Sequence, residues 1–192
     1  MQRVSAKAVT GTRYDASRPF DVAAPVHLAA LAVLLAAMVA IIAVVWLFEW
    51  WGYAPCELCL VQRRPYYFAI AAAVGGIVAV FLALPACAAR GMLAIVGLCL
   101  SATALLAGYH AGVEWGFFPA PETCGAGISA GVSDAGSLLA DLATATPPKC
   151  DEAAGRFLGL SFAGWNLVFA VPLAWAAFAA AAREGLRGRA AH

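Results

Sequence analysis

Four long stretches without a single charged side chain limit what this chain can fold into. They span residues 27–48, 66–84, 91–113 and 157–182. Each is close to or above the length of about 20 helical residues that crosses the hydrocarbon core of a bilayer. Because an unpaired backbone amide is costly in lipid, such stretches cross a membrane as helices. The sequence therefore predicts an all-α membrane protein, a bundle of four transmembrane helices.

The composition agrees with this prediction and excludes other classes of protein. Apolar residues make up 64% of the chain and charged residues 12%, which is unlike a water-soluble domain. The formal net charge of +1 provides no basic surface for nucleic acid. The function is therefore to be sought in a membrane.

Lysine and arginine are unevenly divided between the two sides of the predicted bundle. Eight lie in the N-terminal tail of residues 1–26, the turn after the second helix and the C-terminal tail of residues 183–192. Only four lie in the loops of residues 49–65 and 114–156. The positive-inside rule then predicts that both termini are cytoplasmic and that these two loops lie on the outer side.

The long outer loop contains an amphipathic segment near residues 132–142. One side of its helical wheel carries Val132, Ala135, Leu138, Leu139 and Leu142, and the other carries Ser133, Asp134, Ser137 and Asp141. This pattern predicts a short helix lying on the membrane surface. A loop helix docked on the bundle is the alternative.

The six cysteines are divided by the same topology. On the outer side lie Cys56, Cys59, Cys124 and Cys150. Disulfides persist outside the cytosol, and cysteines joined in pairs would give an even number of cysteines on the outer side, as is found here. Cys87, in the cytoplasmic turn, is expected to be a reduced surface thiol, and Cys99, inside the third helix, a packing residue.

Cys56 and Cys59 form a C-x-x-C motif directly after Pro55, at the start of a helix. There the helix dipole and the unpaired amides lower the pKa of a thiol and favour the thiolate. Two static disulfides, the plain structural alternative, have no need of this placement. A zinc site of four thiolates is a further alternative, but 25 residues separate Cys124 from Cys150, far more than zinc ligand pairs usually have. No metal is therefore expected.

Polar side chains lie in two places near the cysteines: directly after the C-x-x-C motif, and near the C-terminal end of the third predicted helix. Arg63 lies four residues after Cys59, on the same helix face, where a cation can stabilise a thiolate or polarise a carbonyl oxygen. Gln62 adds an amide donor. The alternative is that Arg63 and Arg64 only extend their charged ends to the lipid headgroups. His110, four residues before an acidic residue, is a candidate for lining a polar pocket, although a satisfied interfacial histidine explains it equally well.

Over roughly residues 27–182 the chain resembles the DsbB family of disulfide-bond-formation membrane proteins. The resemblance is carried by the motifs CELCLVQRRPY, GYHAGVEWGFFPAPETC and CDEAAGRFLGLSFAGWN. It implies an oxidoreductase of the bacterial inner membrane with a long periplasmic loop. Such a protein reoxidises a periplasmic DsbA-like thioredoxin-fold oxidase and passes the electrons to a membrane quinone, ubiquinone or menaquinone, so that disulfides are made de novo.

The resemblance also implies roles for single residues. Cys124 matches the loop cysteine that forms a mixed disulfide with the partner, and Cys150 matches its resolving mate. Cys59 matches the thiolate that meets the quinone ring, and Cys56 the cysteine that exchanges with Cys150. Arg63 matches the arginine on the quinone side.

Two other classes of protein remain as alternatives. An enzyme like vitamin K epoxide reductase would carry its C-x-x-C motif late in the chain, after the loop cysteines, whereas here the motif comes first. A non-catalytic four-helix scaffold would have static disulfides and would bind no quinone.

Overall fold

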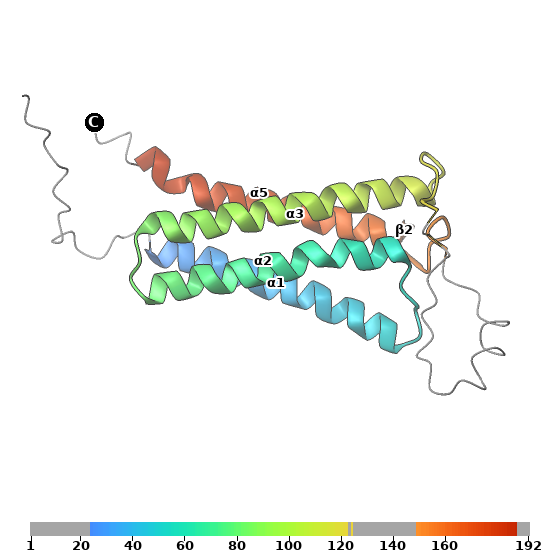
Figure 1. Ribbon diagram of the computed structural model, residues 1–192, viewed down its shortest axis with the longest axis horizontal. Coiled ribbons are helices and arrows are strands. Elements are labelled where there is room, and N and C mark those ends of the chain that lie inside the picture. Colours follow the sequence, from blue (N-terminus) through green and yellow to red (C-terminus); the bar gives the residue numbers. More distant parts are fainter. Residues whose placement is uncertain (1–23, 123, 125–148, 188–192) are drawn as a thin grey trace, which may run out of the picture.

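Four long helices lie side by side along the molecule (Figure 1). The computed structural model describes residues 24–122, 124 and 149–187. The helices are α1 (Ala24–Trp50), α2 (Glu57–Phe81), α3 (Ala86–Glu114) and α5 (Phe162–Arg187). Each contains a segment long and apolar enough to cross a membrane. The predicted bundle of four transmembrane helices is confirmed.

The helix boundaries differ from those of the uncharged stretches, most of all in α2. This helix begins at Glu57 instead of residue 66, so the C-x-x-C motif, Arg63 and Pro65 all belong to its first turns. The uncharged stretch of residues 66–84 could not extend toward the N-terminus past the arginine at position 64, whereas the helix itself does. The helix continues past Arg63, and that side chain is paired with an acidic residue of α1.

A small hairpin replaces the expected beginning of the fourth helix. Strands β1 (Arg156–Phe157) and β2 (Leu160–Ser161) pair antiparallel, and α5 begins only at Phe162. Leu158 and Gly159 between them have φ angles of 51° and 83°, as in the tight turns that match the twist of a hairpin. The indole Nε1 of Trp165 donates to the Phe157 carbonyl at 2.9 Å and ties the hairpin to α5.

Small residues bring the helices close together. α3 packs against both α2 and α5, whereas α1 packs chiefly against α2. A Cβ atom on Gly76 of α2 would lie 2.9 Å from Leu31 of α1 and 3.0 Å from the Cβ of Met92 of α3, so glycine permits this three-helix contact. Because α1 and α5 touch less, their outer ends leave space for a cavity beside α2.

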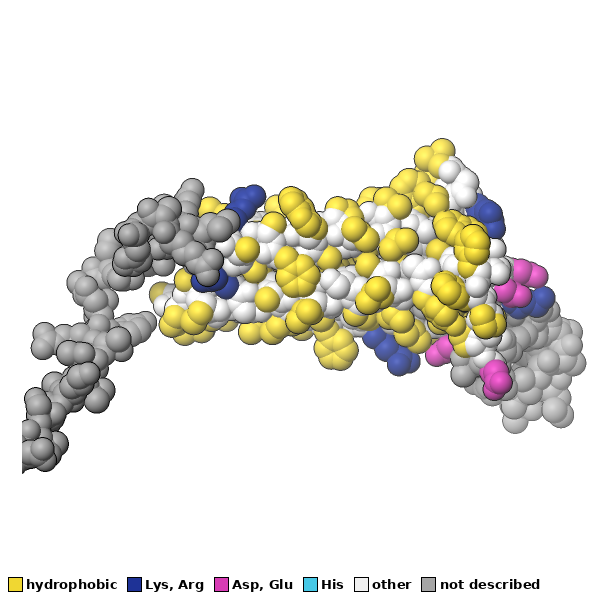
Figure 2. Space-filling view, turned by 90° about the horizontal axis from the view of Figure 1, so that it is seen from above, with side chains coloured by type: hydrophobic (Ala, Val, Ile, Leu, Met, Phe, Trp, Pro, Cys, Tyr) yellow, Lys and Arg dark blue, Asp and Glu magenta, His cyan; other side chains and the backbone are white. Residues whose placement is uncertain are grey.

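The outer surface is that of a protein surrounded by lipid. Large apolar side chains are exposed along all four helices, among them Val33, Phe68, Leu105 and Trp175. Figure 2 shows hydrophobic side chains spread over one face, with the visible acidic side chains gathered toward the end that carries the loop after α3. The protein is therefore a multi-pass membrane protein. The predicted surface helix near residues 132–142 lies outside the described residues.

Candidate redox site

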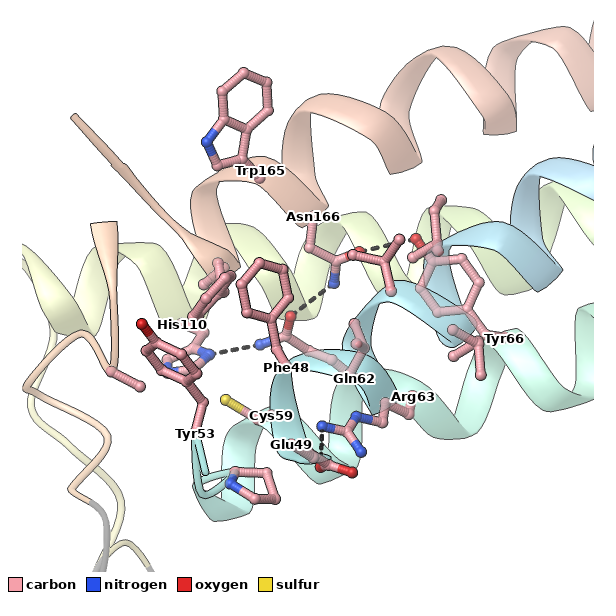
Figure 3. Close-up of a pocket in the computed structure, with 18 of the residues that line it drawn as sticks. Phe48, Glu49, Tyr53, Cys59, Gln62, Arg63, Tyr66, His110, Trp165 and Asn166 are labelled. Carbon is pink, nitrogen blue, oxygen red and sulfur yellow. Dashed lines mark hydrogen bonds and ion pairs between the residues drawn. The ribbon is translucent and has the colours of Figure 1, made fainter. Parts of the chain in front are cut away.

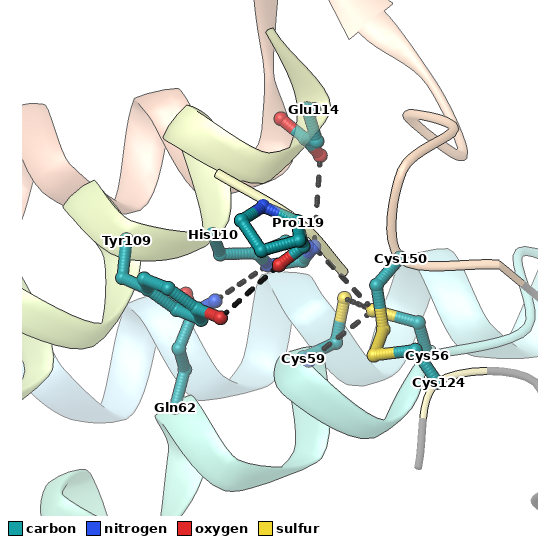
Figure 4. The surroundings of a disulfide bond; sticks show 9 residues. All are labelled: Cys56, Cys59, Gln62, Tyr109, His110, Glu114, Pro119, Cys124 and Cys150. Atoms are coloured by element: carbon teal, nitrogen blue, oxygen red, sulfur yellow. Dashed lines mark hydrogen bonds and ion pairs between the residues drawn. A yellow bond between two sulfur atoms is a disulfide. The ribbon is translucent and has the colours of Figure 1, made fainter. Parts of the chain in front are cut away.

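The four cysteines predicted to lie on the outer side meet where α2 begins and α3 ends (Figure 4). Cys124 and Cys150 form a disulfide, and Cys56 and Cys59 are unbonded. The buried side chains of Cys56 and Cys150 pack together with Val113, and Cys59 and Cys124 lie against this cluster. Because Cys124 and Cys150 are bonded to each other, the four sulfurs are not arranged as four thiolates, and the four cysteines do not form two disulfides. A reactive dithiol instead lies against a disulfide.

Cys56 is the residue that caps the N-terminus of α2. Its backbone is extended, and its Sγ accepts a hydrogen bond from the Cys59 amide at 3.3 Å. The two sulfur atoms are 2.9 Å apart and share a hydrogen bond. The C-x-x-C motif therefore begins a helix as the sequence predicts, with one sulfur at the positive end of the helix dipole.

The pKa of the Cys56 thiol is lowered from its usual value of 9.0 to about 4. The largest cause is the hydrogen bond with the Cys59 side chain; burial acts against it, and the hydrogen bond and charge of His110 assist. The lowered pKa favours the thiolate form of Cys56. The resemblance assigns the quinone-facing thiolate to Cys59, which is the other sulfur of the same pair.

His110 stands behind Cys56 and is oriented by a chain of side chains. Gln62 Nε2 donates to His110 Nδ1 at 2.6 Å, so a ring proton of His110 lies on Nε2. That nitrogen lies 3.6 Å from Cys56 Sγ and 3.8 Å from Glu114 Oε1. The sequence-predicted Gln62 and His110 therefore form one chain of contacts that ends at Cys56.

Two further residues of this chain were missed by the sequence analysis. Asn166 Nδ2 donates to Gln62 Oε1 at 2.7 Å, and the Tyr66 hydroxyl donates to Asn166 Oδ1 at 2.8 Å. Asn166 lies within an uncharged membrane-spanning stretch, where an amide is costly unless it is paired. That isolated amide is the signal in the sequence that could have revealed it.

A cavity of about 340 Å³ opens beside Cys59 (Figure 3). Its walls are mostly apolar and come from α1 and α5, with Ile41, Val45, Phe48, Phe162 and Phe169 among them. Its polar end is formed by Cys59, Gln62, Arg63, His110 and Asn166. Cys59 thus faces the cavity, while Cys56 faces the disulfide.

Arg63 lies in the wall of this cavity, as its place one turn after Cys59 predicts. Its guanidinium pairs with the Glu49 carboxylate of α1 at 2.5 Å, and its side chain is only 12% exposed. Arg64, in contrast, is exposed. Glu49 was not predicted as a site residue, although a single acid at the end of an apolar stretch, in a loop that also carries arginine, is a recognisable signal.

Two thiols held against a disulfide can exchange with it, so the fold and site define a membrane protein whose chemistry is thiol–disulfide exchange. The family model described as disulfide bond formation protein DsbB matches residues 27–180. The chain therefore belongs to the DsbB family and is a membrane oxidoreductase of disulfide bond formation. The resemblance inferred from the motifs is confirmed. Comparison with curated proteins and with solved structures gives no match.

Proposed function

We propose that the protein reoxidises a DsbA-like thioredoxin-fold oxidase and passes the electrons to a membrane quinone. The observation that carries this proposal is the order of the sulfur atoms. Cys56 lies between the Cys124–Cys150 disulfide and Cys59, and Cys59 lines the apolar cavity. An electron pair can therefore pass from the loop to the cavity by exchange between neighbouring sulfurs.

The exchange begins on the loop disulfide. A partner thiolate attacks Cys124, the bond to Cys150 breaks, and Cys150 leaves as a thiolate. The partner's second thiol then releases Cys124, and the partner is oxidised. Cys150 next attacks the Cys56–Cys59 disulfide at Cys56, Cys59 leaves as a thiolate, and Cys124 restores its bond to Cys150. The described state, with Cys124–Cys150 bonded and the other pair reduced, is the one expected after this transfer.

The cavity suits a quinone. Such a molecule has a flat ring with carbonyl oxygens and an apolar tail, and the cavity combines apolar walls with a polar end. Its volume lies within the range of about 300–1,000 Å³ typical of ligand pockets. Arg63 and Asn166 would hold the ring oxygens at the polar end. When bound, the quinone supplies the two-electron oxidant for the Cys56–Cys59 pair.

The chain's own residues prepare the dithiol for that reaction. His110 donates from Nε2 toward Cys56 and favours its thiolate, and Gln62 fixes the tautomer that can do so. Arg63 supplies the positive charge that stabilises negative charge developing in the cavity. Phe48, Tyr53 and Phe162 line the cavity and pack against one another in edge-to-face and tilted arrangements, with ring centres 4.9–5.8 Å apart, which helps to keep water out.

We infer that the site faces the periplasm, with both termini in the cytoplasm. The excess of arginine in the tails and in the turn between α2 and α3 supports this orientation. Cys87 is exposed at that turn, at the opposite end of the bundle from the disulfide. An impermeant maleimide added to intact spheroplasts should leave Cys87 unlabelled and should label it after permeabilisation. Labelling of Cys87 in intact spheroplasts would reverse the orientation.

The partner is tested by trapping the intermediate of the first exchange. In a Cys150→Ala variant the Cys124 thiolate can attack the disulfide of an oxidised DsbA-like protein, and the protein has no resolving thiol to release it. We expect a mixed disulfide on a non-reducing gel, linked through Cys124 by mass spectrometry. The Cys124→Ala/Cys150→Ala double variant is the matched control and should give none. An adduct of equal yield in the double variant would disprove the assignment of Cys124.

A further inference from the structure

The reduced dithiol and His110 form a cluster of metal-binding atoms. Cys56 Sγ, Cys59 Sγ and His110 Nε2 all lie within 4.8 Å of one another. In a tetrahedral zinc site the Zn–S and Zn–N distances of about 2.3 and 2.0 Å place neighbouring ligand atoms about 3.5–3.8 Å apart. Cys56 Sγ and His110 Nε2 are already 3.6 Å apart, and the two sulfurs, 2.9 Å apart, need only a small separation.

A fourth candidate ligand lies beside His110, outside the cluster of three, and lines the same small cavity. The Glu114 carboxylate lies one helical turn after His110, with Oε1 3.8 Å from His110 Nε2. The Glu114 side chain is only 4% exposed, and its Oε2 has no hydrogen-bond partner among the described residues. A buried carboxylate oxygen without a partner is costly, and a cation beside it would remove that cost.

We propose that the reduced site binds one zinc ion through Cys56, Cys59 and His110, and that the Glu114 side chain turns within the shared cavity to provide the fourth ligand. Thiolate and imidazole ligands favour zinc over magnesium or calcium, and C-x-x-C is a common zinc-ligand spacing. The ion takes the place of the proton that the two sulfurs share, which passes to water, and no electron moves. The site differs from a four-thiolate site, since Cys124 and Cys150 are joined to each other.

The hydrogen-bonded chain behind His110 can adapt to the ion. Binding through Nε2 places the ring proton on Nδ1, which then needs an acceptor. Gln62 provides one when its amide turns to present Oε1, and a ligating histidine commonly donates to such an oxygen. The amide of Asn166 and the hydroxyl of Tyr66 can both donate and accept, so the whole chain can reverse without losing a hydrogen bond.

The ion has its own route to the site. A second cavity of about 190 Å³ is lined by all four proposed ligands, and Lys149 and Glu152 also line it. These last two side chains are exposed, so the route opens on the loop side and does not pass through the apolar cavity. The route lies at the end of the bundle where the loops meet, so a hydrated ion need not cross lipid.

Zinc binding would depend on the redox state of the site. Sulfur atoms joined in a disulfide are no longer thiolates, so the cluster exists only while Cys56 and Cys59 are reduced. A bound ion would then hold the electron pair on this dithiol and stop its transfer to the cavity. This consequence rests on the proposed function, whereas the binding itself does not.

Cobalt titration of the full-length protein in detergent tests the proposal directly. The protein is stripped of quinone, reduced and kept anaerobic, and Co²⁺ is added as an optical probe for the zinc site. We expect thiolate-to-cobalt charge-transfer bands and tetrahedral d–d bands that saturate at one ion per chain and disappear when Zn²⁺ is added. The same protein with Cys56 and Cys59 oxidised should show none, a comparison that requires no mutation.

Variants then identify the ligands. Cys59→Ser should abolish the cobalt bands, and Glu114→Gln should weaken binding at least about tenfold while leaving the charge-transfer bands. Cys87→Ser, which removes an exposed thiol at the far end of the bundle, should bind as the wild type does. Equal binding by oxidised and reduced protein, or loss of binding in Cys87→Ser alone, would overturn the proposal. No step of this test uses a partner or a quinone, so its result is independent of electron transfer.

Discussion

A Cys59→Ala protein should oxidise one equivalent of reduced partner and then stop. The Cys124–Cys150 disulfide is intact in this variant and can accept one electron pair. Cys56 alone cannot form the second disulfide. The electron pair taken up by the Cys124–Cys150 disulfide therefore has no route to the cavity. We expect steady-state turnover to fall at least about a thousandfold, as is usual when an essential nucleophile is removed. Rapid-quench measurement of partner oxidation would show the single turnover.

Cys99→Ala is the matched control for this experiment. Cys99 is a partly buried thiol that packs against the core of the bundle, remote from the disulfide. Its removal should leave both the first turnover and the steady state close to wild type. Multiple turnovers by Cys59→Ala would contradict the relay, because the electrons would then be leaving the loop disulfide by another route.

Arg63→Ala should reduce the efficiency of quinone use at least about tenfold, which corresponds to roughly 1.4 kcal/mol. Arg63 lines the cavity beside Cys59, where its charge can stabilise a negative oxygen, whereas Arg64 is exposed. We therefore expect a higher KM for quinone and a lower kcat from the first substitution, and a change of only a few-fold from Arg64→Ala. Steady-state oxidation of the reduced partner at several quinone concentrations measures both.

The pairing of Arg63 with Glu49 calls for a second variant. Removing the arginine leaves the Glu49 carboxylate, which is 29% exposed, without its partner and destabilises the contact between α1 and α2. In Glu49→Gln/Arg63→Ala that unpaired charge is absent, so a quinone defect that persists there is due to the missing cation. Equal, small effects from Arg63→Ala and Arg64→Ala would mean that both side chains only extend to the headgroups.

Features with a local cause could be predicted from the sequence. The four helices follow from apolar stretches that must form their hydrogen bonds internally. The closeness of Arg63 to Cys59 follows from one turn of helix, and the position of Cys56 at a helix start follows from Pro55 and the motif itself. Each of these features is predicted from one continuous segment of the sequence.

Features that join separate helices could not be predicted in the same way. The hydrogen bonds of Gln62 reach His110, 48 residues away, and Asn166, 104 residues away. Which helix faces which is set by packing, and neither spacing nor periodicity contains that information. The lowered pKa of Cys56 has a local largest cause, the hydrogen bond with Cys59, but the further contribution of His110 comes from another helix and is not contained in the spacing.

The central claim is that electrons from a thioredoxin-fold partner leave through a quinone, and the most direct test is a stoichiometry. The purified protein is mixed anaerobically with an excess of reduced DsbA-like partner and a measured amount of ubiquinone or menaquinone. Loss of quinone absorbance and formation of partner disulfide are followed together. The account predicts one quinone reduced for each partner disulfide formed, over many turnovers. Partner oxidation that continues while the quinone stays oxidised would contradict it.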